Sequence, residues 1–123
     1  MSGIKIIADT NTIIYHLSGN RDVEALFEDN TVFISSITYT ELLSSPGLDT
    51  EEEKTLKLYL ASLQIVHTNE FICEIAGGLR RGLKLKLPDA IIAATCFYLD
   101  LPLITFDNDF GKIKDLRVIK LTL

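Results

Sequence analysis

The sequence predicts a three-layer α/β domain, in which helices cover both faces of a central parallel sheet of about four or five strands. Short β-branched or apolar runs alternate with longer segments of helical spacing, which is the order of βαβ units. These runs are too apolar for a strand with one face in water, so both faces should be covered. A length of 123 residues without an internal repeat or linker predicts one domain over residues 1–123.

The first half of the chain should supply two strands and four helices. Residues 4–8 read as a strand that ends at Asp9, and residues 11–17 and 21–28 as helices, with a second strand at residues 31–34. Ser35 or Ser36 can then cap a helix that stops at residues 45–47 (Ser-Pro-Gly). The next helix begins near Thr50 with three glutamates, where the helix dipole favours negative charge, so this acidic run needs no functional explanation.

The second half should supply the remaining strands. Residues 63–66 are a third strand candidate, residues 70–83 and 88–99 have helical spacing, and residues 103–105 and 117–121 read as the last strands. Helices and strands therefore both recur in this half of the chain.

Charge alone does not identify a partner. The net charge of −5 argues against a nucleic-acid partner, because phosphate contacts are made largely by Lys and Arg. The charges are unevenly distributed, however: residues 1–79 hold 4 basic and 12 acidic side chains, whereas residues 80–123 hold 8 basic and 5 acidic ones. Acidity therefore lowers the expectation of a nucleic-acid partner without excluding one.

Membrane insertion and metal binding by Cys or His are not predicted. The apolar run at residues 4–8 is shorter than a signal or membrane segment, so we expect a cytoplasmic protein. Cys73 and Cys96 lie far apart in apolar helical segments, which predicts two reduced, buried thiols. His16 and His67 are isolated and lack an HExxH pattern, so we assign them structural roles.

Four acidic positions are predicted to share one edge of the sheet. Ligand sites of open α/β sheets lie at the carboxyl ends of the strands, near a topological switch point. Asp9 directly follows the first strand, and Asp107 and Asp109 follow the strand that ends at Thr105. Glu41 lies in the helix after the second strand, and Asp89 lies in the first turn of the 88–99 helix, from where both can reach the same edge.

Each acid also has a simple structural explanation. Asp9 can cap a helix, Asp89 can interact with a helix dipole, Glu41 can lie on a solvated face, and residues 107–109 resemble a turn. Convergence of four acids from separate segments is different, because like carboxylates come together when a cation neutralises them. Ligands that are all oxygen suit Mg²⁺ or Mn²⁺.

Four short motifs carry a family resemblance. They are IADTN at residues 7–11, SSITYTEL at 35–42, LPDAIIAAT at 87–95 and LITFDNDF at 103–110. Each is weak alone, but their order and separations are specific. Across essentially its whole length the chain resembles the PIN-domain family, and within it the VapC toxins.

That resemblance implies a metal-dependent endoribonuclease, the toxin of a type II toxin–antitoxin pair, leaving a 5′-phosphate and a 3′-hydroxyl. It implies Mg²⁺ (or Mn²⁺) as cofactor, RNA as substrate, a small antitoxin protein as partner, and a homodimer formed through the early apolar helices. Asp9, Glu41, Asp89 and Asp107 would be catalytic metal ligands, Asp109 an auxiliary acid, and Asn11 and Thr105 supporting residues. One departure is that such toxins often have Asn in place of Asp107 and a longer spacer before Asp-Phe, so either Asp107 or Asp109 can be the nearer ligand.

Basic and aromatic residues each have two interpretations. The basic cluster formed by Arg80, Arg81, Lys84 and Lys86 is either the solvated end of a helix or a rim that contacts RNA phosphates. Helical spacing assigns four aromatic side chains to the core in preference to base stacking: Tyr15, Phe27, Tyr59 and Phe97.

Three rival functions compete with this interpretation. A haloacid-dehalogenase-type phosphotransferase needs a second Asp two residues after the first, where this chain has Asn11. A receiver domain needs an Asp at the end of its third strand, but residues 63–66 are followed by His67, Thr68 and Asn69. The third rival is a catalytically inactive PIN-like module for dimerisation or partner binding, which an intact set of acids disfavours.

Overall fold

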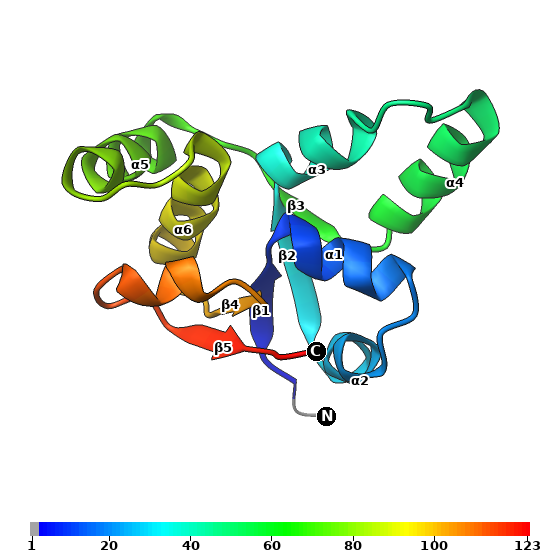
Figure 1. Ribbon diagram of the computed structural model, residues 1–123, viewed down its shortest axis with the longest axis horizontal. Coiled ribbons are helices and arrows are strands. Elements are labelled where there is room, and N and C mark those ends of the chain that lie inside the picture. The colour runs from blue at the N-terminus through cyan, green and yellow to red at the C-terminus, as the bar shows by residue number, and fades with distance from the viewer. Residues whose placement is uncertain (1–2) are drawn as a thin grey trace.

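The computed structural model of the protein describes residues 3–123 of the chain. Five parallel strands form one sheet in the order β3-β2-β1-β4-β5 (Figure 1). They are β1 (Lys5–Ala8), β2 (Thr31–Ser35), β3 (Gln64–Val66), β4 (Leu103–Thr105) and β5 (Val118–Lys120). The chain adds strands first on one side of β1 and then on the other, so a topological switch point lies between β1 and β4. The predicted parallel sheet is confirmed.

Helices cover both faces of this sheet. They are α1 (Thr10–Leu17), α2 (Arg21–Asp29), α3 (Ser36–Leu43), α4 (Thr50–Leu60), α5 (Glu70–Gly82) and α6 (Leu87–Leu99). In Figure 1, α5 and α6 lie to the left of the sheet and α1 and α2 to the right. The three-layer arrangement is therefore as predicted, while a short 3₁₀ helix after β4, η1 (Asn108–Lys112), was not expected from the sequence.

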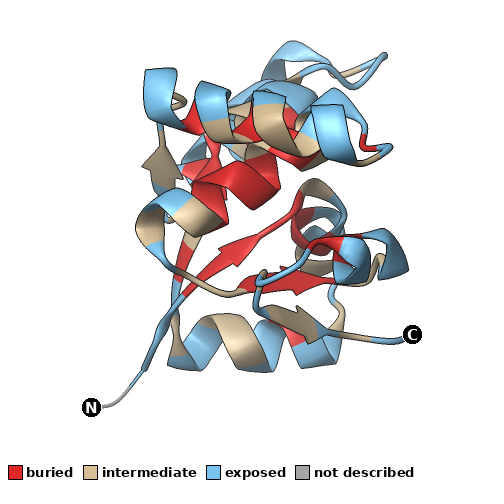
Figure 2. Ribbon diagram, turned by 90° about the vertical axis from the view of Figure 1, so that its left-hand side faces the viewer, coloured by how far each residue is buried: buried red, intermediate tan, exposed pale blue. Residues whose placement is uncertain are grey.

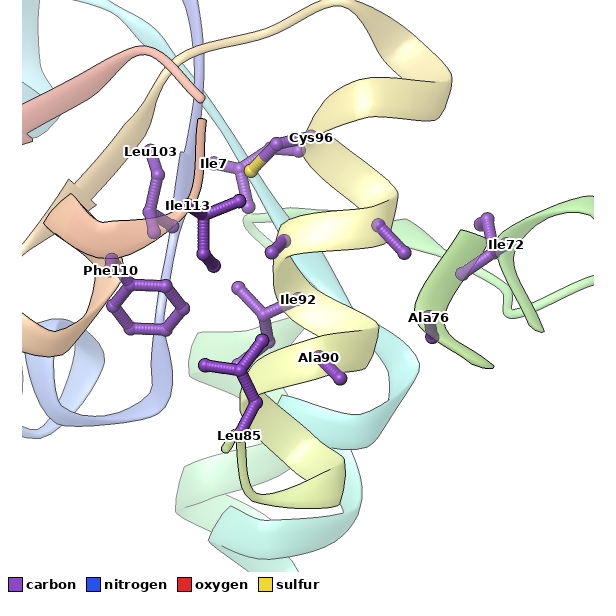
Figure 3. Packing of buried hydrophobic residues seen from close by; sticks show 12 residues of the cluster. Ile7, Ile72, Ala76, Leu85, Ala90, Ile92, Cys96, Leu103, Phe110 and Ile113 are labelled. Atoms are coloured by element: carbon purple, nitrogen blue, oxygen red, sulfur yellow. The ribbon is translucent and has the colours of Figure 1, made fainter. Parts of the chain in front are cut away.

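Alternation along β1 divides the core into two clusters. Ile7 faces a cluster with Leu103 of β4, the buried side of α6 and Phe110 of η1 (Figure 3). Ile6 and Ala8 face the opposite cluster, which α1, α3 and α4 complete. Figure 2 shows β1 and much of α6 as buried ribbon, which agrees with the apolar sequence of both elements.

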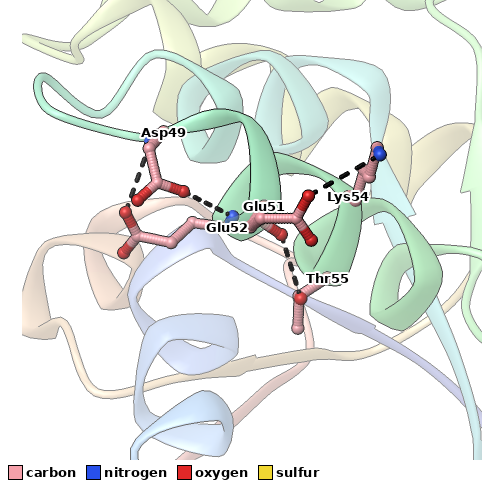
Figure 4. A network of polar contacts seen from close by, with 5 residues as sticks. All are labelled: Asp49, Glu51, Glu52, Lys54 and Thr55. Atoms are coloured by element: carbon pink, nitrogen blue, oxygen red, sulfur yellow. Dashed lines mark hydrogen bonds and ion pairs between the residues drawn. The ribbon is translucent and has the colours of Figure 1, made fainter.

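Side-chain caps determine where the first five helices begin. The N-cap residue of each helix from α1 to α5 accepts a hydrogen bond from a backbone N–H in the first turn. At α4, Asp49 and Glu52 form a reciprocal capping box (Figure 4), so the glutamate run stabilises a helix start as predicted. By contrast, α6 has Pro88 in its first turn, and Lys86 at its N-cap makes no capping side-chain bond.

The two cysteines differ in environment. Both are free, and Cys96 is buried as predicted, but Cys73 is exposed, so the predicted burial of that thiol is wrong. The buried stripe of α5 runs through Ile72 and Ala76, and Cys73 is one residue, or about 100° of helix rotation, away from Ile72. Throughout residues 3–123, no helix is both long enough and apolar enough to cross a membrane.

Candidate active site

The switch point contains a small acidic cavity. Asp9 directly follows β1, Asp107 lies two residues beyond β4, Glu41 lies in α3, and Asp89 lies in the first turn of α6. All four carboxylates line one cavity of about 180 Å³, whose other lining residues are Thr10, Asn11, Lys86, Pro88 and Ile92. Elements that are far apart in the sequence thus bring the predicted acids to one place.

Asp9 is the most firmly held of these acids. It is 5% exposed and is the N-cap of α1: its Oδ1 accepts from the Thr12 backbone N–H at 3.0 Å and the Thr12 hydroxyl at 2.6 Å. Its Oδ2 accepts from the hydroxyl of Thr105, which is fully buried. Both oxygens are therefore oriented by hydrogen bonds, one of which comes from Thr105.

Thr105 also connects Asp9 to Asp107. Its hydroxyl oxygen accepts the backbone N–H of Asp107 at 3.0 Å while donating its own proton to Asp9. Asp107 in turn caps η1, because its Oδ1 accepts the backbone N–H of Asp109 at 2.8 Å. Asp109 itself is exposed and does not line the cavity. Of these two acids, Asp107 is therefore the one that lines the cavity.

Glu41 and Asp89 complete the carboxylate group from the helices. Glu41 is exposed, and its Oε1 accepts the hydroxyl of Thr10 at 2.6 Å. The pKa of Asp89 is raised above its usual 3.8, first by burial and then by the negative charges of Asp107, Asp9 and Glu41, against an opposing effect of Lys86. The four acids are therefore close enough for the other three to disfavour the ionised form of Asp89.

The basic cluster identified in the sequence divides into two places. Lys86 lines the acidic cavity and is the one basic residue in its described lining. Arg80, Arg81 and Lys84 instead line a separate hollow of about 530 Å³ formed by α5 and the start of α6. Arg80 is partly held there, because its Nε donates to the Leu85 carbonyl at 3.2 Å.

The cavity has the chemistry of a divalent-cation site. Within residues 3–123, no three Asp, Glu, His or Cys side chains form a ready-made set of ligands for one ion. Mg²⁺ does not require such a set, because it retains several waters and is commonly held by one or two carboxylates. Four carboxylates against a single lysine leave a negative site, as the raised pKa of Asp89 reflects, and a divalent cation would offset much of that charge.

The other titratable candidates lie outside this site. The Nδ1 of His16 lies 2.7 Å from the hydroxyl of Tyr59, and burial lowers the pKa of His16, so it has the structural role predicted for it. Burial raises the pKa of Cys96 to about 12, which keeps the thiol protonated and unsuitable as a nucleophile.

Two further hollows adjoin the acidic cavity. A groove of about 800 Å³ runs between α1, α3 and α4, is mainly apolar, and includes Glu41 in its wall. A second hollow, of about 370 Å³, shares Asn11 and Asp107 with the cavity and contains Tyr15, Phe106 and Lys120. Phe106 and Lys120 did not stand out in the sequence, although Phe106 lies inside the LITFDNDF motif.

Comparisons with known proteins agree with this architecture. The family model described as "PIN domain" matches residues 6–116. Ribonuclease VapC2 of Methanocaldococcus jannaschii is 27% identical over 145 residues, which cover 95% of this chain and 94% of that protein. A toxin–antitoxin complex from Klebsiella pneumoniae contains a chain with 33% identity and a TM-score of 0.80, with 96% of this chain and 99% of that one covered. VapBC-1 from nontypeable Haemophilus influenzae has 25% identity and a TM-score of 0.79, with 94% and 97% covered.

Proposed function

The chain belongs to the PIN domain family, and from that premise we propose that it is a divalent-metal-dependent endoribonuclease, the toxin of a type II toxin–antitoxin pair. The observation that carries the proposal is the cavity in which Asp9, Glu41, Asp89 and Asp107 meet at the switch point of the sheet. The similarity of the chain to Ribonuclease VapC2 supports RNA as the substrate.

In this proposal the four acids have graded roles. They would hold Mg²⁺ or Mn²⁺, which when bound supplies positive charge for the phosphate and activates a water molecule. Asp9 is the fixed ligand, because hydroxyl and backbone donors orient both of its oxygens. Glu41 comes from α3 and Asp89 from α6, and Asp107 is held beside Asp9 because both contact the Thr105 hydroxyl.

Lys86 would contact the RNA. A negative substrate has to approach a negative cavity, and Lys86 is the cation that the cavity wall already holds. Its ammonium would bind a phosphate oxygen at the reacting position and offset the charge that develops there. Arg80, Arg81 and Lys84 would contact phosphates farther along the strand, since they line the neighbouring hollow. Asp109, exposed and outside the cavity, would act only as an auxiliary acid.

The apolar groove between α1, α3 and α4 is the proposed antitoxin surface. Ile14 and Leu17 in its wall are 48% and 49% exposed and lie together in a mainly apolar groove, and contiguous exposed apolar surface of this kind marks interaction sites. Because Glu41 lies in both the groove and the cavity, a bound segment would also obstruct the acids.

The homodimer implied by the family resemblance stays a prediction, to be measured by light scattering.

Cleavage assays test the enzymatic proposal. Purified protein should cut single-stranded RNA with Mg²⁺ or Mn²⁺ and not in EDTA, and Asp9→Asn and Asp89→Asn should abolish cutting. Asn caps helices about as well as Asp, so Asp9→Asn should keep the wild-type circular dichroism spectrum. Asp89→Asn should keep it too, because Asp89 lies in the first turn of α6 but is not its N-cap, and Asn has nearly the same shape. Asp22→Asn is the matched control, because Asp22 is exposed on α2 and lies outside the cavity.

Two results would contradict the proposal. Full metal-dependent cleavage by Asp9→Asn or Asp89→Asn would contradict the assignment of the site. If a small antitoxin-like protein is encoded by a neighbouring gene, its tight binding combined with absence of any cleavage by the wild type would favour the inactive partner-binding module. For the groove, Leu17→Glu should weaken that binding, whereas Leu58→Glu should not, because Leu58 is 77% exposed on α4 but does not line the groove.

A further inference from the structure

The second hollow beside the acidic cavity has the composition of a nucleotide subsite. Its volume is about 370 Å³, and its described lining comprises Asn11, Tyr15, Phe106, Asp107, Lys120 and residues 121–123. Asn11 and Asp107 also line the acidic cavity, so the two spaces are neighbours with two lining residues in common. A group bound in the hollow would therefore lie next to the phosphate that reacts in the acidic cavity.

Two aromatic rings form one wall of the hollow. Tyr15 comes from α1 and Phe106 from the segment after β4, and their ring centroids are 4.5 Å apart at an interplanar angle of 45°. Both side chains are half-buried. Among the described residues, neither belongs to either hydrophobic core cluster, so the pair leaves ring surface toward the hollow.

The polar residues of the hollow suit a nucleotide. The exposed Asn11 carries an amide that can both donate to and accept from the edge of a base. Lys120 also lines the hollow, and after its contact with the Leu121 carbonyl at 3.1 Å its ammonium has further protons for a phosphate. Stacking rings, an amide and a cation together are the usual elements of single-strand recognition.

We propose that this hollow binds the base of the nucleotide adjacent to the cleaved phosphate, with the base stacked on the Tyr15–Phe106 pair and its edge contacted by Asn11. The inference rests on the proposed ribonuclease function and adds a base-binding subsite to it. The subsite holds an unstacked base while the acids act on the neighbouring phosphate.

A second aromatic pair provides an internal control. Phe71 of α5 and Tyr98 of α6 stack with ring centroids 6.3 Å apart, and both are exposed. Tyr98 lies at the end of α6 opposite Asp89, and neither ring of the pair lines the acidic cavity. Substitution of Tyr98 therefore removes an exposed aromatic ring without touching the proposed subsite.

The test is a binding cycle between protein variants and RNA. Asp9→Asn protein binds a short fluorescent single-stranded RNA without cutting it, and its affinity is compared for the intact RNA and for RNAs with one abasic nucleotide at each position in turn. At one position the loss of the base should weaken binding about 5-fold or more, as stacking contributions predict. Adding Tyr15→Leu or Phe106→Leu should abolish that difference, whereas adding Tyr98→Leu should leave it unchanged.

The outcomes separate the subsite from the ribonuclease function. Because two aromatic variants are tested, melting curves identify one that fails to fold and the other still decides. Equal abasic penalties in all variants, or no penalty at any position, would overturn the subsite even if the wild type cleaves RNA. Failure of the wild type to cleave overturns the ribonuclease proposal instead. Loss of binding to the protein of the neighbouring gene, without any effect on RNA, would make the hollow a protein-binding surface and also overturn the inference.

Discussion

Replacing Thr105 with Val should destabilise the protein and impair the active site together. The Thr105 hydroxyl is fully buried, donates to the Asp9 carboxylate and accepts from the Asp107 backbone, and Val has nearly the same shape without either capacity. A hydrogen bond to a charged group contributes about 1.5–3 kcal/mol net. At about 4 °C per kcal/mol for a domain of this size, the melting temperature should fall by about 6–12 °C.

Thr95→Val is the matched control. Thr95 is also fully buried, but its hydroxyl donates at 2.7 Å to the Ile91 carbonyl within α6, which is a neutral acceptor already used by the helix. Removing such a bond costs about 0.5–1.5 kcal/mol, so the melting temperature should fall less, and RNA cleavage at saturating Mg²⁺ should be unchanged. Thr105→Val, by contrast, should lower cleavage because the hydroxyl that holds both Asp9 and Asp107 is removed.

Thermal melting in EDTA, followed by far-UV circular dichroism, measures the first effect, and initial cleavage rates measure the second. A Thr105→Val protein that melts within about 1 °C of the Thr95→Val protein would show that the hydrogen bond to the Asp9 carboxylate contributes no more to stability than the neutral bond of Thr95. Wild-type cleavage by Thr105→Val would show that orientation of Asp9 by this hydroxyl is unnecessary.

Three further predictions concern charge. In EDTA, the raised pKa of Asp89 means that the native state holds this proton more tightly than the unfolded chain does. Its contribution to stability is therefore present below pH 3.8 and is lost as pH rises through the raised pKa. Mg²⁺ at about 100 times its dissociation constant should then add roughly 2.7 kcal/mol to the free energy of unfolding at neutral pH, and a melting temperature that divalent ions change no more than NaCl does would argue against the site. Lys86→Gln should slow cleavage at saturating Mg²⁺ and Lys86→Arg should restore it, with Lys114→Gln as control because Lys114 is exposed and lines none of these hollows; equal rates for Lys86→Gln and Lys114→Gln would remove Lys86 from the reaction. Replacing Arg80, Arg81 and Lys84 together with Gln should reduce the log–log salt slope of RNA binding by about 0.7 for each phosphate that the variant no longer neutralises, and an unchanged slope would return them to a solvated helix end.

The sequence predicts the sheet and the location of the acids for the same physical reason. Parallel strands place their carboxyl ends at one edge, so an acid that directly follows a strand, such as Asp9, has its position determined by where the strand ends. Apolar runs without alternation indicate strands buried on both faces, and β4 is fully buried as its composition suggests. These inferences need only local patterns and one rule of topology.

The remaining details depend on contacts between distant segments. Asp107 and Asp109 could not be ranked from sequence, because their directions depend on η1, a short turn whose cap is Asp107 itself. Lys84 and Lys86 could not be separated, because the connection between α5 and α6 has no repeating pattern that assigns sides. Helical spacing predicts Tyr15 in the core, whereas its ring packs on the sequence-distant Phe106 at the edge of a hollow.

The structural and functional interpretations of the acids are not alternatives. Asp9 caps α1 through Oδ1 as the sequence suggested, and Asp107 caps η1 through Oδ1 where the sequence suggested only a turn. A cap, however, fixes the direction of a carboxylate, and a group of carboxylates at a cation site needs fixed directions. Capping by Asn would satisfy the same backbone donors without a negative charge. Asp lies at both caps, and Glu41 and Asp89 add two further negative charges to the same cavity. These charges repel one another, and capping alone does not require them. The excess charge, and not the position of any one acid, is what points to a bound cation.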